Sequence, residues 1–166
     1  DVPETKTVPA YDNTNIAPRC VIGLDRDGVI NVDAIDMSKD YVYKVEDFKP
    51  IEGSLHAITK LRYLGHKIVV ITNQGGISKG LYTSDDVEAV HSHMFDLLAQ
   101  AGCPTIDALF YSESSLRSDM YAKPNTGMFK RCENEVKHIK FKQGYYLLSN
   151  PRPNGCYTNI ERWETG

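Results

Sequence analysis

The chain has 166 residues, of which 41% are hydrophobic and 25% are charged, and its formal net charge is −3. This composition is enough for one sizeable hydrophobic core, and the acidic balance offers none of the basic surface that is typical of nucleic-acid-binding proteins. No apolar run approaches the length of a membrane-spanning helix, so we expect a soluble protein.

The first predicted element is a tail. Residues 1–18 contain Pro3, Pro9 and Pro18 and little apolar sequence, which predicts an extended N-terminal segment. The folded core is expected to occupy residues 19–166.

From residue 20 onward, short apolar runs alternate with helical patterns. Strands are predicted at 20–24, 67–72, 108–112 and 145–148, and helices at 53–64, 84–101 and 126–139. The second helix has a capping-box-like start at Thr83 and Asp86 and stops at Gly102. This alternation predicts an α/β fold of three layers, with a parallel sheet and helices on both of its faces.

Polar residues follow these strands at the points where ligands bind in such folds. Asp25 and Asp27 end the first strand, Thr72 and Asn73 end the second, and Lys123 precedes the third long helix. Each motif has an ordinary structural explanation when taken singly, because Asx-Gly pairs make turns. Together, however, they converge on the carboxyl edge of one sheet, and this indicates a functional site.

Four ordered motifs carry a resemblance to a known family. The segments DRDGVINVD (25–33), YVYKVEDFKPIEG (41–53), VVITNQGGISKG (69–80) and KPNTGM (123–128) resemble the haloacid dehalogenase superfamily of phosphohydrolases. Within it, the chain is similar to the histidinol-phosphate and heptose-bisphosphate phosphatases, from about Arg19 to Leu147. The resemblance implies a Rossmann-like core without a cap domain.

The resemblance also implies catalytic roles. Asp25 would attack phosphorus and form an aspartyl-phosphate, and Asp27 would protonate the leaving oxygen and then activate water. Thr72 would donate a hydrogen bond to the phosphoryl group, and Lys123 would supply positive charge beside it.

Substrate and metal contacts are implied in the same way. Asn73 would donate to phosphoryl oxygens. Lys79 stands where relatives often have an arginine, so it is expected either to contact substrate or to lie in solvent. Mg²⁺ would be held by the Asp25 carboxylate, by the main-chain carbonyl of Asp27, and in relatives by one further acid after a later strand.

Three departures from the family pattern lie in the second half of the chain. Ser149 stands where the further metal-binding acid is expected, and Ala122 replaces a common arginine. The loop 112–121 lacks the cysteine and histidine zinc ligands of many relatives, so no zinc is expected. After Ser149 the connection to the next strand-like stretch is short and contains proline, which indicates a shortened, divergent C-terminal part.

The remaining cysteines and histidines favour no metal site. The cysteines are scattered without a CxxC pair, which indicates free thiols in a reducing intracellular compartment; they are Cys20, Cys103, Cys132 and Cys156. That compartment is the cytoplasm, or an organelle if a targeting peptide preceded Asp1. His91 and His93 lie two apart on a predicted helix, so they are expected at the surface on different sides.

Three functions compete on these grounds. The favoured interpretation is a catalytically impaired descendant of a phosphatase that serves as a subunit or scaffold with protein partners and without a cofactor. The alternative is an active Mg²⁺-dependent phosphatase of the histidinol-phosphate or heptose-bisphosphate type, acting on a phosphorylated small molecule. The third is a polynucleotide-end phosphatase or binder, which KPNTGM also resembles and which the acidic charge disfavours.

Overall fold

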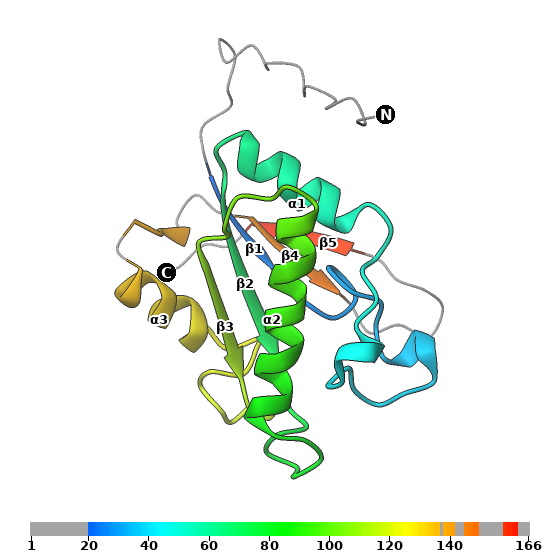
Figure 1. The fold of residues 1–166 in the computed structure, drawn as a ribbon. Coiled ribbons are helices and arrows are strands. Elements are labelled where there is room, and N and C mark those ends of the chain that lie inside the picture. The colour runs from blue at the N-terminus through cyan, green and yellow to red at the C-terminus, as the bar shows by residue number, and fades with distance from the viewer. Residues whose placement is uncertain (1–19, 137, 142–144, 150–157, 163–166) are drawn as a thin grey trace, which may run out of the picture.

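A computed structural model of the chain describes residues 20–136, 138–141, 145–149 and 158–162 (Figure 1). The predicted tail, residues 1–18, lies outside the described residues, so the division of the chain at residue 18 stays a prediction. In the described part, no helix is long and apolar enough to cross a membrane.

The predicted strands and helices are present, with small changes at their ends. The elements are β1 (Val21–Leu24), α1 (Ser54–Tyr63), β2 (Lys67–Asn73), α2 (Ser84–Gln100), β3 (Ala108–Ser112), α3 (Gly127–Glu135), β4 (Tyr145–Ser149) and β5 (Thr158–Arg162). The capping box at the start of α2 is confirmed, because the Thr83 hydroxyl accepts from the Asp86 amide and the Asp86 carboxylate accepts from the Thr83 amide.

Helix α3 is shorter than the predicted helix at 126–139. Val136 has φ −112° and ψ 84°, which is not helical. The apolar spacing continues beyond it all the same, because Ile139 and Phe141 are buried in the same core as Phe129. The apolar residues after Glu135 are therefore spaced like those of a helix because they are buried in the core, although the chain there is no longer helical.

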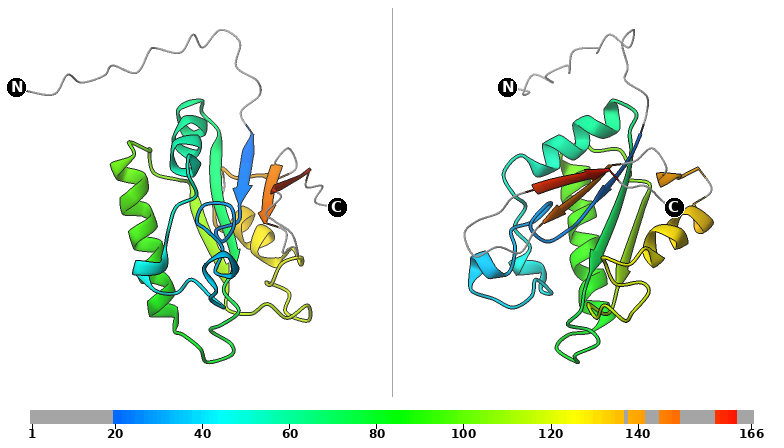
Figure 2. Two further views of the ribbon diagram at one scale, coloured as in Figure 1. Left: turned by 90° about the vertical axis from the view of Figure 1, so that its right-hand side faces the viewer. Right: turned by 180° about the vertical axis from the view of Figure 1, so that it is seen from behind.

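The sheet has the order β3-β2-β1-β4-β5. Strand β1 is parallel to β2 and to β4, and β2 is parallel to β3. Helices α1 and α2 cover one face and α3 covers the other (Figures 1 and 2). Alternate residues of β2 face opposite ways: Ile68 and Val70 pack with α1 and α2, whereas Val69 and Ile71 pack with α3. The three-layer α/β prediction is confirmed.

Strand β5 departs from the parallel pattern, because it pairs antiparallel with β4. A parallel return needs a crossover connection of about a dozen or more residues. Only residues 150–157 separate the two strands, so an antiparallel pair is the arrangement that this connection permits.

The segment between β1 and α1 folds back on the sheet instead of forming a cap domain. It contains two single 3-10 turns, η2 (Ile35–Met37) and η3 (Val45–Asp47). Main-chain bonds close it, from the Val32 amide to the Lys49 carbonyl at 2.8 Å and from the Ile51 amide to the Ile30 carbonyl at 2.9 Å.

Candidate active site

A buried ion pair lies at the centre of the carboxyl edge of the sheet. Asp25 directly follows β1, and its Oδ2 is 2.8 Å from Lys123 Nζ, with side chains 14% and 10% exposed. The ammonium also donates to the Ile71 carbonyl at 2.9 Å. Burial raises the pKa of Asp25, which the Lys123 charge opposes, and burial lowers the pKa of Lys123, which the Asp25 charge opposes. Each group therefore stabilises the charged form of the other.

Asn73 fixes the position of this lysine. Its Oδ1 accepts from the Lys123 amide at 2.9 Å, and its Nδ2 donates to the Lys123 carbonyl at 3.1 Å. The side chain expected to contact phosphate is thus engaged with the main chain of Lys123. This clamp joins the end of β2 to the segment before α3, fifty residues further along the chain.

Thr72 and Gln74 connect the end of β2 to the second aspartate. Thr72 is fully buried, and its Oγ1 accepts from Gln74 Nε2 at 3.0 Å. The same Nε2 donates to Asp27 Oδ2 at 3.1 Å. The Thr72 hydroxyl retains its own proton for donation to a further acceptor.

Asp27 lies in a dense set of donors. Asn31 Nδ2 donates to Oδ1 at 3.0 Å, and the Arg26 guanidinium donates to Oδ1 through Nε at 3.2 Å and through Nη2 at 2.9 Å. Nη2 also lies 3.1 Å from Oδ2. Gly28, with φ 76°, makes the left-handed turn that brings the following residues back toward the carboxylate.

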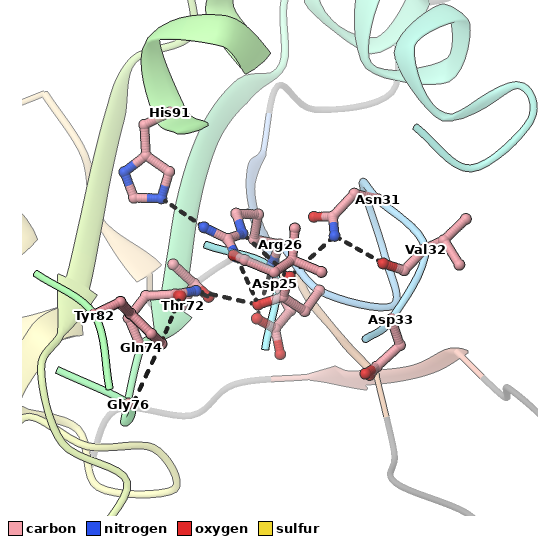
Figure 3. A network of polar contacts seen from close by, with 12 residues as sticks. Asp25, Arg26, Asn31, Val32, Asp33, Thr72, Gln74, Gly76, Tyr82 and His91 are labelled. Atoms are coloured by element: carbon pink, nitrogen blue, oxygen red, sulfur yellow. Dashed lines mark hydrogen bonds and ion pairs between the residues drawn. The ribbon is translucent and has the colours of Figure 1, made fainter. Parts of the chain in front are cut away.

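Arg26 also contacts this site, and the sequence analysis overlooked it. It is fully buried, its Nη2 donates to the Val42 carbonyl at 2.6 Å, and its Nη1 lies 3.3 Å from His91 Nε2 (Figure 3). The sequence did contain a signal for its burial. Ile22, Leu24 and Arg26 are spaced two apart, so they lie on the same face of the strand, which α2 covers. His91 is only 1% exposed, so the expectation of a surface histidine is wrong for this residue.

Lys79 lies at the outer end of a chain of contacts. Its side chain is exposed, and Nζ donates to the Tyr41 hydroxyl at 2.8 Å. Tyr41 packs edge-on against Tyr82, whose hydroxyl donates to Gln74 Oε1 at 3.3 Å. A Cβ on Gly76 would lie 2.1 Å from the Tyr82 ring, so this glycine gives the tyrosine its room.

The donors at this edge fit a magnesium ion that is shared with a phosphate. Among the described residues, no group of three or more His, Cys, Asp or Glu side chains could hold a metal. The carboxylates present at this edge are those of Asp25 and Asp27. Mg²⁺ is commonly held by one or two carboxylates, water and substrate phosphate. Position 149 lies at the same edge, two residues beyond Leu147, which pairs with Leu24.

The buried histidine predicts a pH-dependent stability. Burial, and then the Arg26 charge, lowers the pKa of His91 from 6.5 to about 3. The folded-state pKa is depressed, so between these values the unfolded chain binds a proton that the folded chain does not. Stability is therefore lost as the pH falls from 6.5 toward 3, by at most about 1.4 kcal/mol per pH unit.

Replacing His91 by glutamine, which can still accept from Arg26, should flatten this dependence. The measurement is denaturant unfolding of both chains at several pH values across that window. His56→Gln, an exposed position in α1, is the matched control and should keep the wild-type slope. Equal slopes for wild type and His91→Gln would show that His91 is accessible to protons in the folded chain.

A doubly covered parallel sheet with two aspartates and a lysine at its carboxyl edge defines the haloacid dehalogenase class of phosphatase folds. The family model described as polynucleotide kinase 3 phosphatase matches residues 21–147. The chain belongs to this family, within the haloacid dehalogenase superfamily.

Known relatives are similar over about half to three quarters of the chain. The D-glycero-beta-D-manno-heptose-1,7-bisphosphate 7-phosphatase of Pseudomonas aeruginosa is 40% identical over 84 residues, which are 51% of this chain and 45% of that protein. The enzyme of that name from Escherichia coli is 31% identical over 134 residues, 76% of this chain and 67% of that protein. The chain thus spans about half the length of the first of these curated relatives.

Solved structures agree with the fold. The D,D-heptose 1,7-bisphosphate phosphatase of B. bronchiseptica, complexed with magnesium and phosphate, superposes with a TM-score of 0.63 at 31% identity, covering 71% of this chain and 64% of that one. A HAD-like phosphatase from Mesorhizobium loti also gives a TM-score of 0.63, at 27% identity, covering 80% and 65%.

These relatives overturn the favoured interpretation of an impaired subunit or scaffold. They are named as phosphatases, and the family model matches residues 21–147, which include Asp25, Asp27 and Lys123. The expectation was wrong because it gave too much weight to the acid missing at position 149 and the arginine missing at position 122. A dication that binds together with a phosphate does not need every ligand from the protein.

Proposed function

We propose that the chain is a Mg²⁺-dependent phosphomonoesterase that acts on a phosphorylated sugar, of the heptose-bisphosphate type. The observation that carries this proposal is the buried contact of 2.8 Å between Asp25 and Lys123, at the strand end that also presents Asp27. A carboxylate nucleophile beside a fixed ammonium suits attack on a phosphate dianion, because the cation offsets like-charge repulsion. The names of the relatives support the substrate class.

In the first step, Asp25 attacks phosphorus. The new bond joins the carboxylate oxygen to phosphorus, and the bond from phosphorus to the sugar oxygen breaks. Lys123 contacts this carboxylate, and the Thr72 hydroxyl lies at the end of the neighbouring strand β2; both would stabilise the charge on the phosphoryl oxygens. The Asn73 clamp keeps the ammonium in place during transfer.

Asp27 acts first as the general acid and then as the general base. It gives a proton to the departing sugar oxygen and then accepts one from the water that attacks the aspartyl-phosphate, which regenerates Asp25 and releases phosphate. Asp27 is 26% exposed, so it borders both the solvent and the network behind it.

Magnesium would be held by Asp25, by the main chain at Asp27 and by the substrate phosphate. When bound, it supplies positive charge that lowers the repulsion between the nucleophile and the phosphate. The magnesium and phosphate bound to the B. bronchiseptica structure support this assignment.

A polynucleotide 3′-phosphatase is the second candidate, because the family model carries that description. The net charge of −3 disfavours it, since such substrates are bound largely through phosphate contacts to basic residues.

Phosphate release from a substrate panel tests the proposal. The panel comprises a heptose bisphosphate, hexose monophosphates, a 3′-phosphorylated oligonucleotide and p-nitrophenyl phosphate, each with Mg²⁺ and with EDTA. We expect Mg²⁺-dependent release, with kcat/KM highest for a sugar phosphate. A preference for the oligonucleotide would favour the second candidate, and no release from any substrate would refute both.

The residue at position 149 should set the magnesium requirement. Replacing Ser149 by aspartate adds a carboxylate at the strand end beside β1, so the Mg²⁺ concentration for half-maximal activity should fall about tenfold or more. The measurement is a Mg²⁺ titration of the rate at saturating substrate, with Ser149→Asn as the uncharged control. An unchanged requirement would show that position 149 does not face the metal.

A further inference from the structure

The Arg26 guanidinium is a charged group in the core, and two of its three nitrogens donate to one carboxylate. Its side chain is 0% exposed and lies between β1 and α2. Taking a charge out of water is costly unless it is paired and hydrogen-bonded. Here the pairing partner is Asp27, a residue that the proposed mechanism uses for proton transfer.

We propose that Arg26 is a positioning residue that fixes the orientation of the Asp27 carboxylate for proton transfer to the leaving group. This inference rests on the proposed function. Nε and Nη2 hold Asp27 from one side, and Gln74 and Asn31 complete the set of donors. The carboxylate is thereby held against rotation by three separate side chains.

Arg26 is itself held by two partners other than Asp27. The Val42 carbonyl accepts from Nη2 at 2.6 Å, and His91 Nε2 lies 3.3 Å from Nη1. Because a guanidinium has no acceptor, Nε2 must be the acceptor in this contact, which leaves the proton of the neutral ring on Nδ1. That Nδ1 has no hydrogen-bond partner among the described residues and lies in a ring that meets Tyr111 edge-on.

A neutral histidine is necessary in this arrangement. A protonated ring would place a second cation against the buried guanidinium, and burial together with Arg26 lowers the pKa of His91 to about 3. His91 therefore serves as an uncharged acceptor that orients the guanidinium of Arg26. A lysine at position 26 could not reach these partners together, because it lacks the planar fork of donors.

Two substrates with different leaving groups distinguish a positioning role of Arg26 from a purely structural one. A sugar alkoxide must be protonated as it leaves, so its departure depends on where Asp27 points. The p-nitrophenolate ion leaves without a proton. Transfer of phosphate to Asp25 should therefore respond to Arg26 with the first substrate and hardly at all with the second, and kcat/KM reports this transfer step.

The experiment compares Arg26→Met and Arg26→Lys with wild type on the best sugar phosphate of the panel and on p-nitrophenyl phosphate. We expect kcat/KM to fall about 10²-fold for the sugar phosphate and less than tenfold for p-nitrophenyl phosphate. In an Asp27→Asn background, Arg26→Met should cost nothing further with the sugar phosphate. Equal losses on both substrates, or full additivity with Asp27→Asn, would overturn the proposal.

Arg62→Met is the matched control. Arg62 is another well-partnered arginine, bound to Asp107 at 3.0 Å and to the Thr105 carbonyl at 2.8 Å, near the amino ends of the strands. Its loss should lower stability without changing the ratio of the two kcat/KM values. A change in that ratio in Arg62→Met would mean that the readout follows stability and would also overturn the proposal.

A crystal structure of Arg26→Met tests the positioning role without an activity measurement. We expect the Asp27 carboxylate to adopt a different orientation, or more than one, in an otherwise unchanged fold. An Asp27 carboxylate that keeps its contacts to Asn31 and Gln74 unaltered would refute the positioning role. If wild type hydrolyses nothing in the panel, the proposed function fails, and this structure still tests the contact between Arg26 and Asp27.

Discussion

Replacing Asp25 by asparagine should abolish phosphate release, with a fall in kcat of roughly 10⁴- to 10⁶-fold. An amide oxygen is a poor nucleophile, so no covalent phosphoryl-enzyme forms when Asn occupies position 25. The change keeps the size of the side chain and leaves Lys123 facing a neutral acceptor. Acid quenching with ³²P-labelled substrate should therefore trap label on wild type and none on Asp25→Asn.

The matched control is Asp36→Asn, an exposed aspartate in η2. It should retain wild-type kcat and the trapped label. Trapped label in Asp25→Asn at the wild-type level would place the nucleophile elsewhere and would remove the central residue from the proposed mechanism.

Replacing Lys123 by methionine should lower kcat/KM by about 10²- to 10³-fold, because one fixed charge beside the phosphoryl group is lost. It should also destabilise the fold by about 3 kcal/mol, since Asp25 then lies mostly buried without its cation. Phosphate release and denaturant unfolding measure the two effects separately.

A double variant distinguishes the two roles of the lysine. Asp25→Asn combined with Lys123→Met removes both charges, so stability should recover relative to Lys123→Met while activity stays absent. Lys130→Met, an exposed lysine in α3, should change neither quantity. A Lys123→Met chain as active as wild type would contradict the charge role, and one as stable as wild type would contradict the buried pair.

The sequence by itself determined the layers of this protein and the edge on which its site lies. Continuous apolar runs such as 67–72 and helical spacing such as that of α2 are local signals, and a parallel sheet follows from their alternation. Because parallel strands share one carboxyl edge, the order of the strands and the residues that follow them are enough to bring Asp25, Asp27 and Thr72 together.

The family function was misjudged from the sequence for a specific reason. Ser149 is one missing ligand, and its effect was judged as though the protein alone had to supply a complete metal cage. The relatives named as phosphatases corrected this interpretation. The direction of β5 was also missed, although the shortness of 150–157 already excluded a crossover.

Only the tertiary structure decided what surrounds the carboxylates of Asp25 and Asp27. The contact of Arg26 with His91 joins residues 65 positions apart, and the clamp of Asn73 on the main chain of Lys123 joins residues 50 positions apart. Sequence period places a residue on a face, but it does not say which side chain from another element meets it there. Partners of buried polar groups are chosen by packing across elements, so their identity appears only when the chain has folded.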